Sequence, residues 1–192
     1  GDKSRGADLE LLITKIKTSA THSQIIGLSA VLGSSEKLAQ WLGARLCKLE
    51  RRPVELRKGV LHNGVFQYVE HNNGTVGEEH FGLVENEQFG QFAQLVGHVR
   101  RFAEAGEQSL VFCKSKQECI KAALAVAKQL RVARSAKALE ELSILEDSNT
   151  KDLLARLLEH GVAYHNADLE WDHRDIVERA FRAGEIRVIC AT

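Results

Sequence analysis

Apolar residues in the first part of the chain fall into two kinds of pattern, which predict helices and short buried strands. A first helix is predicted over residues 7–17, because the apolar positions there have the i, i+3, i+4, i+7 spacing of one helical face. The apolar run at 24–30 predicts a buried strand, and the run at 46–49 a further short one. Between them, Ser34 is placed to cap a helix that ends at Gly43. The apolar positions are Leu9, Leu12, Ile13 and Ile16 in the first helix, and Leu38, Trp41 and Leu42 in the second.

The only proline, Pro53, interrupts this pattern and marks a boundary between two parts of the chain. Proline can continue neither a helix nor a central strand. Beyond it, the residues Val65–Val69 predict a strand, and HNNGTVGEEH at 71–80 predicts a polar, glycine-rich loop. We therefore expect one incomplete α/β unit before Pro53 and most of a second unit after it.

The remaining sequence predicts a regular succession of helices and strands. Residues 89–106 have a helical apolar face, and 109–113 form a short apolar run that predicts a strand. Ser115 and Glu118 form a capping box at the start of the next helix. The later segments are helices around 139–145 and 153–158, then strands at 162–164 and 186–191 with an amphipathic helix between them. Strands that alternate with helices predict an α/β fold with a largely parallel sheet.

Polar residues follow the predicted strands at the points where the strands end. The carboxyl ends of parallel strands share one edge of a sheet, so such residues of the second unit are expected to line one surface. Lys114, together with the helix N-terminus at Ser115, favours an anion such as phosphate. Each residue also has a plain structural interpretation, as a helix cap, a turn histidine or a buried hydroxyl. The residues concerned are Ser29, Lys114, Ser115, His165, Asn166 and Thr192.

The composition is that of an ordinary globular protein, and it does not indicate a binding partner. The residues are 44% hydrophobic and 27% charged, and 26 basic residues balance 26 acidic ones, so the net charge does not point to nucleic acid or to a membrane. The start of the chain does not have the pattern of a signal peptide, and no apolar run reaches membrane-spanning length. The cysteines form no C-x-x-C pair, which predicts reduced, mostly buried thiols in a cytosolic protein and no zinc site. They are Cys47, Cys113, Cys119 and Cys190.

Five stretches, taken in order, resemble a central part of a superfamily 2 (DEAD/DEAH-type) helicase. The branch that they resemble contains the archaeal fork-repair helicases and the helicase part of DNA polymerase theta. GDKSRGADLELLITKI resembles the segment after the Walker B box, IIGLSAV motif III, and RRPVELRKGV the crossing between two RecA-like domains. SLVFCKSKQEC resembles motif IV, and GVAYHNADLEWDHRDIVERAFRAGEIRVICAT motif IVa and the start of motif V.

The resemblance implies the end of one RecA-like domain followed by most of a second. Residues 1–50 would close the first domain, 51–86 would form the crossing and the start of the second domain, and 87–192 would form the second domain up to motif V. Such domains bind ATP between them and hold single-stranded nucleic acid across their tops.

The resemblance also gives roles to particular residues. Ser29 and Ala30 match motif III, which couples the ATP state to strand binding, although Val31 stands where the family has threonine. Lys114 and Ser115 match motif IV and would contact the phosphate backbone. His165, followed by Asn166, matches the first histidine of the family's His-His-Ala-Gly-Leu stretch, and Thr192 matches the motif V threonine, which is expected on a phosphate. Asn166 and Asp168 replace the second histidine and the glycine of that stretch.

The implied function is that of a 3′–5′ DNA helicase of repair or replication restart. The parent protein would need ATP and Mg²⁺, yet these residues contain no G-x-x-x-x-G-K-[ST] loop, so we expect no catalytic residue, no metal site and no activity in this chain alone. The expected partner is single-stranded DNA, with no membrane, in a monomeric cytoplasmic or nuclear protein. An RNA helicase of the same superfamily and a non-catalytic nucleic-acid-binding or interaction module are the alternatives.

Overall fold

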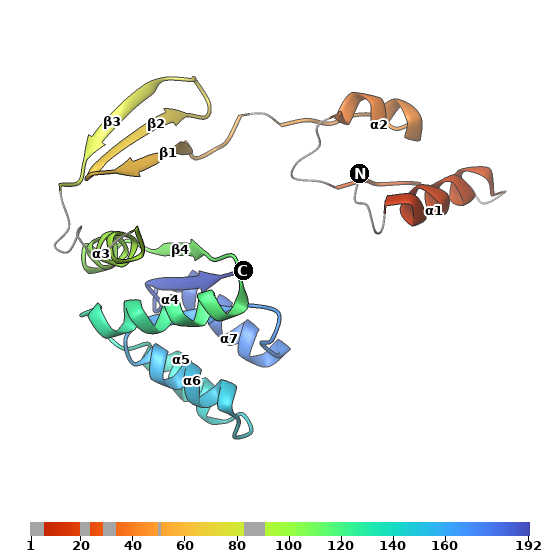
Figure 1. Cartoon of the computed structure of the whole chain (residues 1–192). Helices are drawn as coiled ribbons and strands as arrows, with labels where there is room; N and C mark the ends of the chain where they lie inside the picture. The colour runs from red at the N-terminus through yellow and green to blue at the C-terminus, as the bar shows by residue number, and fades with distance from the viewer. Residues whose placement is uncertain (1–5, 20–23, 29–33, 50, 83–90) are drawn as a thin grey trace. The chain divides into compact units, whose positions relative to one another are not determined.

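The computed structural model describes residues 6–19, 24–28, 34–49, 51–82 and 91–192 (Figure 1). These residues divide into two compact units. The N-terminal unit is Gly1–Lys58 with Val69–Thr75, and the C-terminal unit is Gly59–Tyr68 with Val76–Thr192. No helix among the described residues is both long enough and apolar enough to cross a membrane.

The N-terminal unit contains two helices, α1 (Gly6–Thr18) and α2 (Ser35–Leu42). The helix predicted at 7–17 is confirmed, but no residue of α1 is buried, and Leu12 of its apolar face is 55% exposed. The strand predicted at 24–30 is wrong over residues 24–28, which are not part of any sheet, and Leu28 is 94% exposed. Amphipathic spacing makes a helical face suitable for burial, but burial also needs a surface to cover it.

The second helix, α2, begins and ends where the sequence predicts. Ser34 is its N-cap residue, although its side chain makes no capping hydrogen bond, and Gly43 takes the left-handed conformation at the C-terminus with φ 66°. Trp41 of the predicted apolar face is 38% exposed, and the Lys17 ammonium lies 5.1 Å from the centre of its ring. The predicted strand at 46–49 is absent, because residues 44–49 have no regular structure.

A three-stranded sheet follows, in the order β1 (Arg57–His62), β2 (Val65–Glu70) and β3 (Val76–His80). The predicted strand at 65–69 is therefore confirmed, whereas the loop predicted at 71–80 is wrong because half of it is β3. Asn63 and Gly64 alone connect β1 to β2, and both have positive φ, 49° and 72°. A two-residue turn of this kind matches the twist of a β-hairpin, which explains the register of the two strands.

The second sheet, which lies wholly within the C-terminal unit, is parallel and has the order β4–β6–β5. Its strands are β4 (Ser109–Phe112), β5 (Val162–His165) and β6 (Val188–Ala191). The helices are α3 (Gln91–Glu104), α4 (Lys116–Gln129), α5 (Ala136–Ser143), α6 (Asn149–Leu158) and α7 (Trp171–Arg182). Every helix and strand predicted between residues 91 and 192 is present, which confirms an α/β fold with a parallel sheet.

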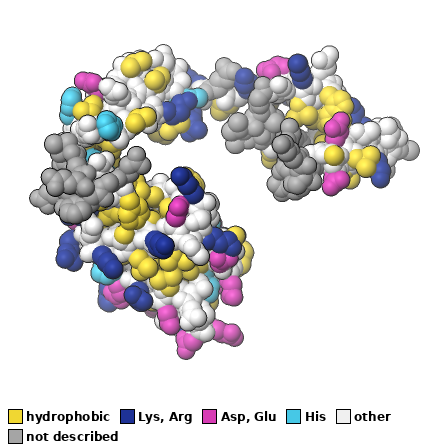
Figure 2. Space-filling view, viewed as in Figure 1, with side chains coloured by type: hydrophobic (Ala, Val, Ile, Leu, Met, Phe, Trp, Pro, Cys, Tyr) yellow, Lys and Arg dark blue, Asp and Glu magenta, His cyan; other side chains and the backbone are white. Residues whose placement is uncertain are grey.

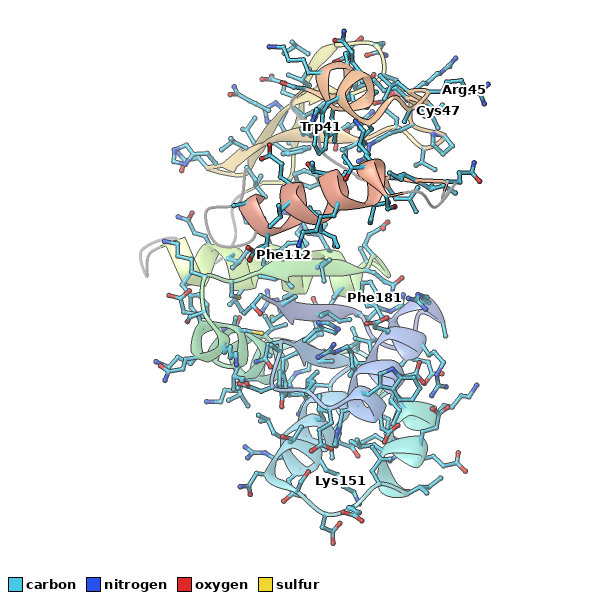
Figure 3. The ribbon with its side chains drawn as sticks, turned by 90° about the vertical axis from the view of Figure 1, so that its right-hand side faces the viewer. Trp41, Arg45, Cys47, Phe112, Lys151 and Phe181 are labelled. Atoms are coloured by element: carbon cyan, nitrogen blue, oxygen red, sulfur yellow. The ribbon has the colours of Figure 1, made fainter. Side chains whose placement is uncertain are left out.

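The core of this unit lies around β6, the central strand, all four residues of which are buried. Helix α4 packs on β5 and β6, and α6 packs on β5. Alanines such as Ala122 and Ala123 allow α4 to lie close to the sheet, since both are buried. The edge strand β4 is covered less completely, and Phe112, labelled in Figure 3, is 73% exposed.

Lys151 on α6 joins the ends of two helices, α5 and α6, within this unit (Figure 3). Its ammonium donates to the carbonyl oxygens of Ser143 (3.1 Å) and Leu145 (2.6 Å) and to the Asp147 carboxylate (2.9 Å). The side chain is 15% exposed, so these bonds replace water that the charge has lost. The pKa of the Asp147 carboxyl is lowered, mainly by its hydrogen bond to Lys151.

Candidate nucleic-acid interface

The polar residues predicted to share an edge come off three neighbouring strands of the C-terminal sheet. In the register of the sheet, Phe112 lies beside Ala191, and Ala191 beside His165. The pairing continues one residue further, because the Cys113 amide donates to the Ala191 carbonyl at 2.8 Å and the Thr192 amide to the His165 carbonyl at 3.2 Å. Neighbouring strands lie about 4.8 Å apart. Lys114, Thr192 and the turn after His165 therefore leave the sheet at one edge.

Ser115 acts as the N-cap of α4. Its hydroxyl oxygen accepts a hydrogen bond from the Glu118 amide at 3.2 Å, and the Glu118 carboxylate accepts one from the Lys114 amide at 3.2 Å. The predicted capping box is confirmed, with Glu118 reaching the amide one residue before the cap. The capping interpretation of Ser115 is thus correct, and its hydroxyl proton is the only group that the side chain could still donate to a phosphate.

Lys114 supplies an exposed positive charge at this edge. It follows β4 directly, and its ammonium has no ion-pair partner among the residues that the structure describes. A lysine ammonium is a compact charge on a flexible stem and can follow a phosphate over several positions. Of the residues predicted for phosphate binding, Lys114 is the one whose geometry leaves its charge most accessible.

His165, at the end of β5, is held by an acidic side chain of α7. Its Nε2 lies 3.2 Å from Oε1 of Glu178. The other carboxylate oxygen of Glu178, Oε2, accepts a hydrogen bond from Arg182 at 3.2 Å. The His165 side chain is 30% exposed. The ring is therefore oriented by Glu178 and leaves Nδ1 as the nitrogen that could contact a ligand.

Asn166 shapes the turn that follows β5. It is 3% exposed, its side-chain oxygen accepts from the Asp168 amide at 3.0 Å, and its carbonyl accepts from the Leu169 amide at 3.2 Å. Its amide Nδ2 is buried and has no hydrogen-bond partner among the described residues. Its observed role is therefore to build the turn, and the unpaired amide nitrogen is a donor that a ligand could use.

Asp168 connects this turn to the beginning of α4. Its carboxylate forms an ion pair with the Lys116 ammonium, and the two side chains are 61% and 50% exposed. Sequence reasoning did not select Lys116, although it directly follows the capping serine. The contact could not be read from spacing, because 52 residues separate the partners.

Charge on the rest of this unit is mixed. Figure 2 shows dark blue and magenta side chains interspersed over one face of the C-terminal unit. Glu178 pairs with Arg182 on the same helix and also contacts His165. The edge therefore carries cations that are partly balanced by nearby carboxylates.

The thiols beside the edge are unsuited to nucleophilic chemistry. Burial raises the pKa of Cys190 to about 12, and burial also raises the pKa of Cys113 and of Cys119. The Cys119 thiol donates to the Cys190 carbonyl at 2.9 Å. The expectation of buried, reduced thiols holds for Cys119 and Cys190, whereas Cys47 is exposed. All four cysteines are free of disulfides.

Two further predictions concern motif III and a site for ATP and Mg²⁺. Ser29 and Ala30, assigned to motif III by resemblance, lie outside the described residues, as does Val31. Among the residues that are described, no three His, Cys, Asp or Glu side chains come together as ligands for a metal ion. The sequence also has no phosphate-binding loop of the G-x-x-x-x-G-K-[ST] type, so the residues that the structure describes offer neither a phosphate cradle of this type nor a cluster of metal ligands for ATP and Mg²⁺.

The known proteins compared with this chain below all have the same name. No protein-family model matches the chain. The whole chain aligns with proteins named ATP-dependent DNA helicase Hel308, at 38% identity in Pyrobaculum calidifontis, 37% in Pyrococcus horikoshii and 36% in Methanococcus vannielii. It spans 26%, 25% and 26% of the lengths of these relatives. The resemblance to superfamily 2 helicases is thereby confirmed: over its whole length, the chain is homologous to one segment of the Hel308 ATP-dependent DNA helicases.

Proposed function

We propose that this chain works as part of an ATP-dependent DNA helicase, in which the edge formed by β4, β6 and β5 contacts the backbone of single-stranded DNA. The observation that carries the proposal is the alignment of the whole chain with helicases whose names specify DNA. The arrangement of the parallel sheet supports it, because Lys114, Thr192 and the His165 turn leave adjacent strands.

The proposed domain organisation rests on the order of the five stretches that resemble superfamily 2 helicases. Residues 1–50 would complete a first RecA-like domain, 51–86 would form the crossing, and 87–192 would form most of a second domain. ATP and Mg²⁺ would bind to parts of the parent protein outside these residues. The 192-residue chain alone should therefore hydrolyse no ATP, with or without single-stranded DNA, and phosphate release at the rate of a helicase would contradict this.

The proposed contacts hold phosphates and read no bases. Lys114 would bind a phosphate through its ammonium, Ser115 through its hydroxyl proton, and His165 through Nδ1. The Asn166 amide and the Thr192 hydroxyl would add neutral donors. Contacts of this kind weaken with salt and change little with base sequence.

The test uses the parent protein, the longer polypeptide to which the proposal assigns this chain. Binding of fluorescein-labelled oligodeoxythymidylate is measured by anisotropy for the wild type and for Lys114→Ala. Removal of one exposed phosphate contact should weaken binding about two- to fivefold and reduce the salt slope by about 0.7. Lys128→Ala, at the far end of α4, is the matched control and should leave the affinity unchanged.

Three outcomes would count against the proposal. Unchanged affinity in Lys114→Ala and in His165→Ala would show that this edge does not hold the strand. Stronger stimulation of ATP hydrolysis by single-stranded RNA than by DNA would favour an RNA helicase. Absence of any ATPase activity from the parent protein, together with retained strand binding, would favour a non-catalytic binding module.

A further inference from the structure

Lys116 is a second positive charge at the proposed interface, and it is already paired. It begins α4 immediately after the capping Ser115, so it lies two residues from Lys114. Its ammonium contacts the carboxylate of Asp168 in the turn after β5. Both side chains are at least half exposed, so a ligand in solvent can reach the pair.

The carboxylate of the pair comes from an ordered turn. The Asp168 amide donates to the side-chain oxygen of Asn166 at 3.0 Å, and Asn166 is buried. A hydrogen bond of this kind fixes the backbone two residues after an asparagine. The turn thus brings the negative charge of Asp168 to the start of α4.

We infer that Asp168 is an internal competitor that occupies Lys116 and lowers the affinity of this edge for DNA phosphates. The inference rests on the proposed function, because it concerns the same edge. A carboxylate and a phosphate offer an ammonium the same kind of partner, an anionic oxygen. A phosphate that approaches Lys116 must therefore displace Asp168 or share the ammonium with it, and in either case the negative charge of Asp168 repels the phosphate.

The size of the effect follows from the exposure of the pair. An exposed ion pair contributes up to about 1 kcal/mol, which corresponds to about fivefold in an equilibrium constant. Removal of the Asp168 charge should therefore raise the affinity for single-stranded DNA about two- to fivefold. If Lys116 then gains one phosphate, the salt slope of binding should become steeper by about 0.7.

The experiment measures binding of labelled oligodeoxythymidylate to the parent protein between low and moderate salt, for Asp168→Asn, Lys116→Ala and the double variant. Asp168→Asn should bind more tightly and with a steeper salt slope than the wild type. In the Lys116→Ala background, Asp168→Asn should have a much smaller effect, because the paired ammonium is gone. Asp168→Ser serves as a second neutral variant in case the asparagine alters the turn.

Asp175→Asn is the matched control for net charge. Asp175 is an exposed carboxylate on α7 that pairs with Arg179 on the same helix at 2.8 Å. Its replacement removes one negative charge without freeing Lys116, so it should leave the salt slope unchanged.

The results separate this inference from the proposed function. If the wild type does not bind single-stranded DNA, or if Lys114→Ala and His165→Ala both leave the affinity unchanged, the proposed function fails. If Lys114→Ala weakens binding as expected, three results would overturn the role of Asp168: no gain in Asp168→Asn and Asp168→Ser, an equal gain in Asp175→Asn, or an undiminished gain in the Lys116→Ala background.

Discussion

Gly161 connects α6 to β5, and replacing it with alanine should destabilise the C-terminal unit strongly. Gly161 has φ +64°, a conformation that glycine adopts without cost and alanine does not. A Cβ atom at this position would lie 2.8 Å from Val132 Cγ2 and 3.2 Å from the Ala133 carbonyl oxygen. Both are closer than van der Waals contact, and valine is stiff about χ1, so its methyl group cannot move away easily.

The destabilisation expected for Gly161→Ala has two parts. The left-handed conformation costs an L-residue about 1–2 kcal/mol. Crowding in a packed region adds about 1–3 kcal/mol. Gly184 isolates the first part, because it has φ +78° and a Cβ atom there would meet nothing within 4 Å. We expect about 2–5 kcal/mol of destabilisation for Gly161→Ala and about 1–2 kcal/mol for Gly184→Ala.

Thermal and urea unfolding of the 192-residue chain, followed by far-ultraviolet circular dichroism, measures the difference. For a unit of this size each kcal/mol shifts Tm by about 4 °C, so Gly161→Ala should melt roughly 10 °C below the wild type. Equal destabilisation of the two variants would refute the reasoning, because the clash with Val132 would then have no energetic effect. A Gly161→Ala, Val132→Ala double variant should recover part of the loss if the methyl contact is the cause.

Three further predictions concern charges and thiols. Lys151→Met should lower the free energy of unfolding by about 2–3 kcal/mol in urea denaturation, because the Ser143 and Leu145 carbonyl oxygens and the Asp147 carboxylate lose a charged donor. Since the folded pKa of Asp147 lies below its ordinary 3.8, its contribution to stability is present above that pH and is lost as the pH falls through the folded pKa. The loss of stability at acid pH should be smaller in Lys151→Met. An unchanged pH profile of stability would refute Lys151 as the cause of the lowered pKa of Asp147. In native titration with a thiol reagent, the exposed Cys47 should react first and the fully buried Cys190 last, and the reverse order would contradict the structure.

Residues 91–192 of the C-terminal unit were predictable because their sequence signals agree with one another. The capping box at Ser115 fixes where α4 begins, and the left-handed Gly161 follows the end of α6. Each strand is a short apolar run between such markers, and each finds partners within the chain. Consistency between local signals and available partners is what allows a pattern to specify a structure.

The N-terminal unit shows the limit of the same reasoning. The apolar residues Leu9, Leu12 and Ile16 predicted the helix α1, but none of them is buried. The apolar run at 24–28 forms no strand, because a strand exists only when its backbone pairs with another. The C-terminal unit has one such failure as well: β3 was missed although the Asn63–Gly64 hairpin before β2 indicated a sheet that could accept another strand.

The candidate interface was predictable only in part. Sequence order placed Lys114, His165 and Thr192 at one edge, because parallel strands end on the same side of a sheet. It could not show that Asp168 pairs with Lys116 or that Glu178 orients His165. Such contacts depend on how distant segments pack, and sequence spacing reveals pairs only within one helix.

The position of β6 between β4 and β5 has a consequence for biosynthesis. The ribosome delivers β4 and β5 before β6, yet these two strands do not pair with each other, since both bond only to β6. Until β6 leaves the exit tunnel, the nascent chain holds two strands with unpaired edges and a helix, α4, without the sheet that it covers. Pairing of β4 and β5 into this sheet during translation must therefore wait for β6, and over that interval chaperones have the greatest opportunity to bind.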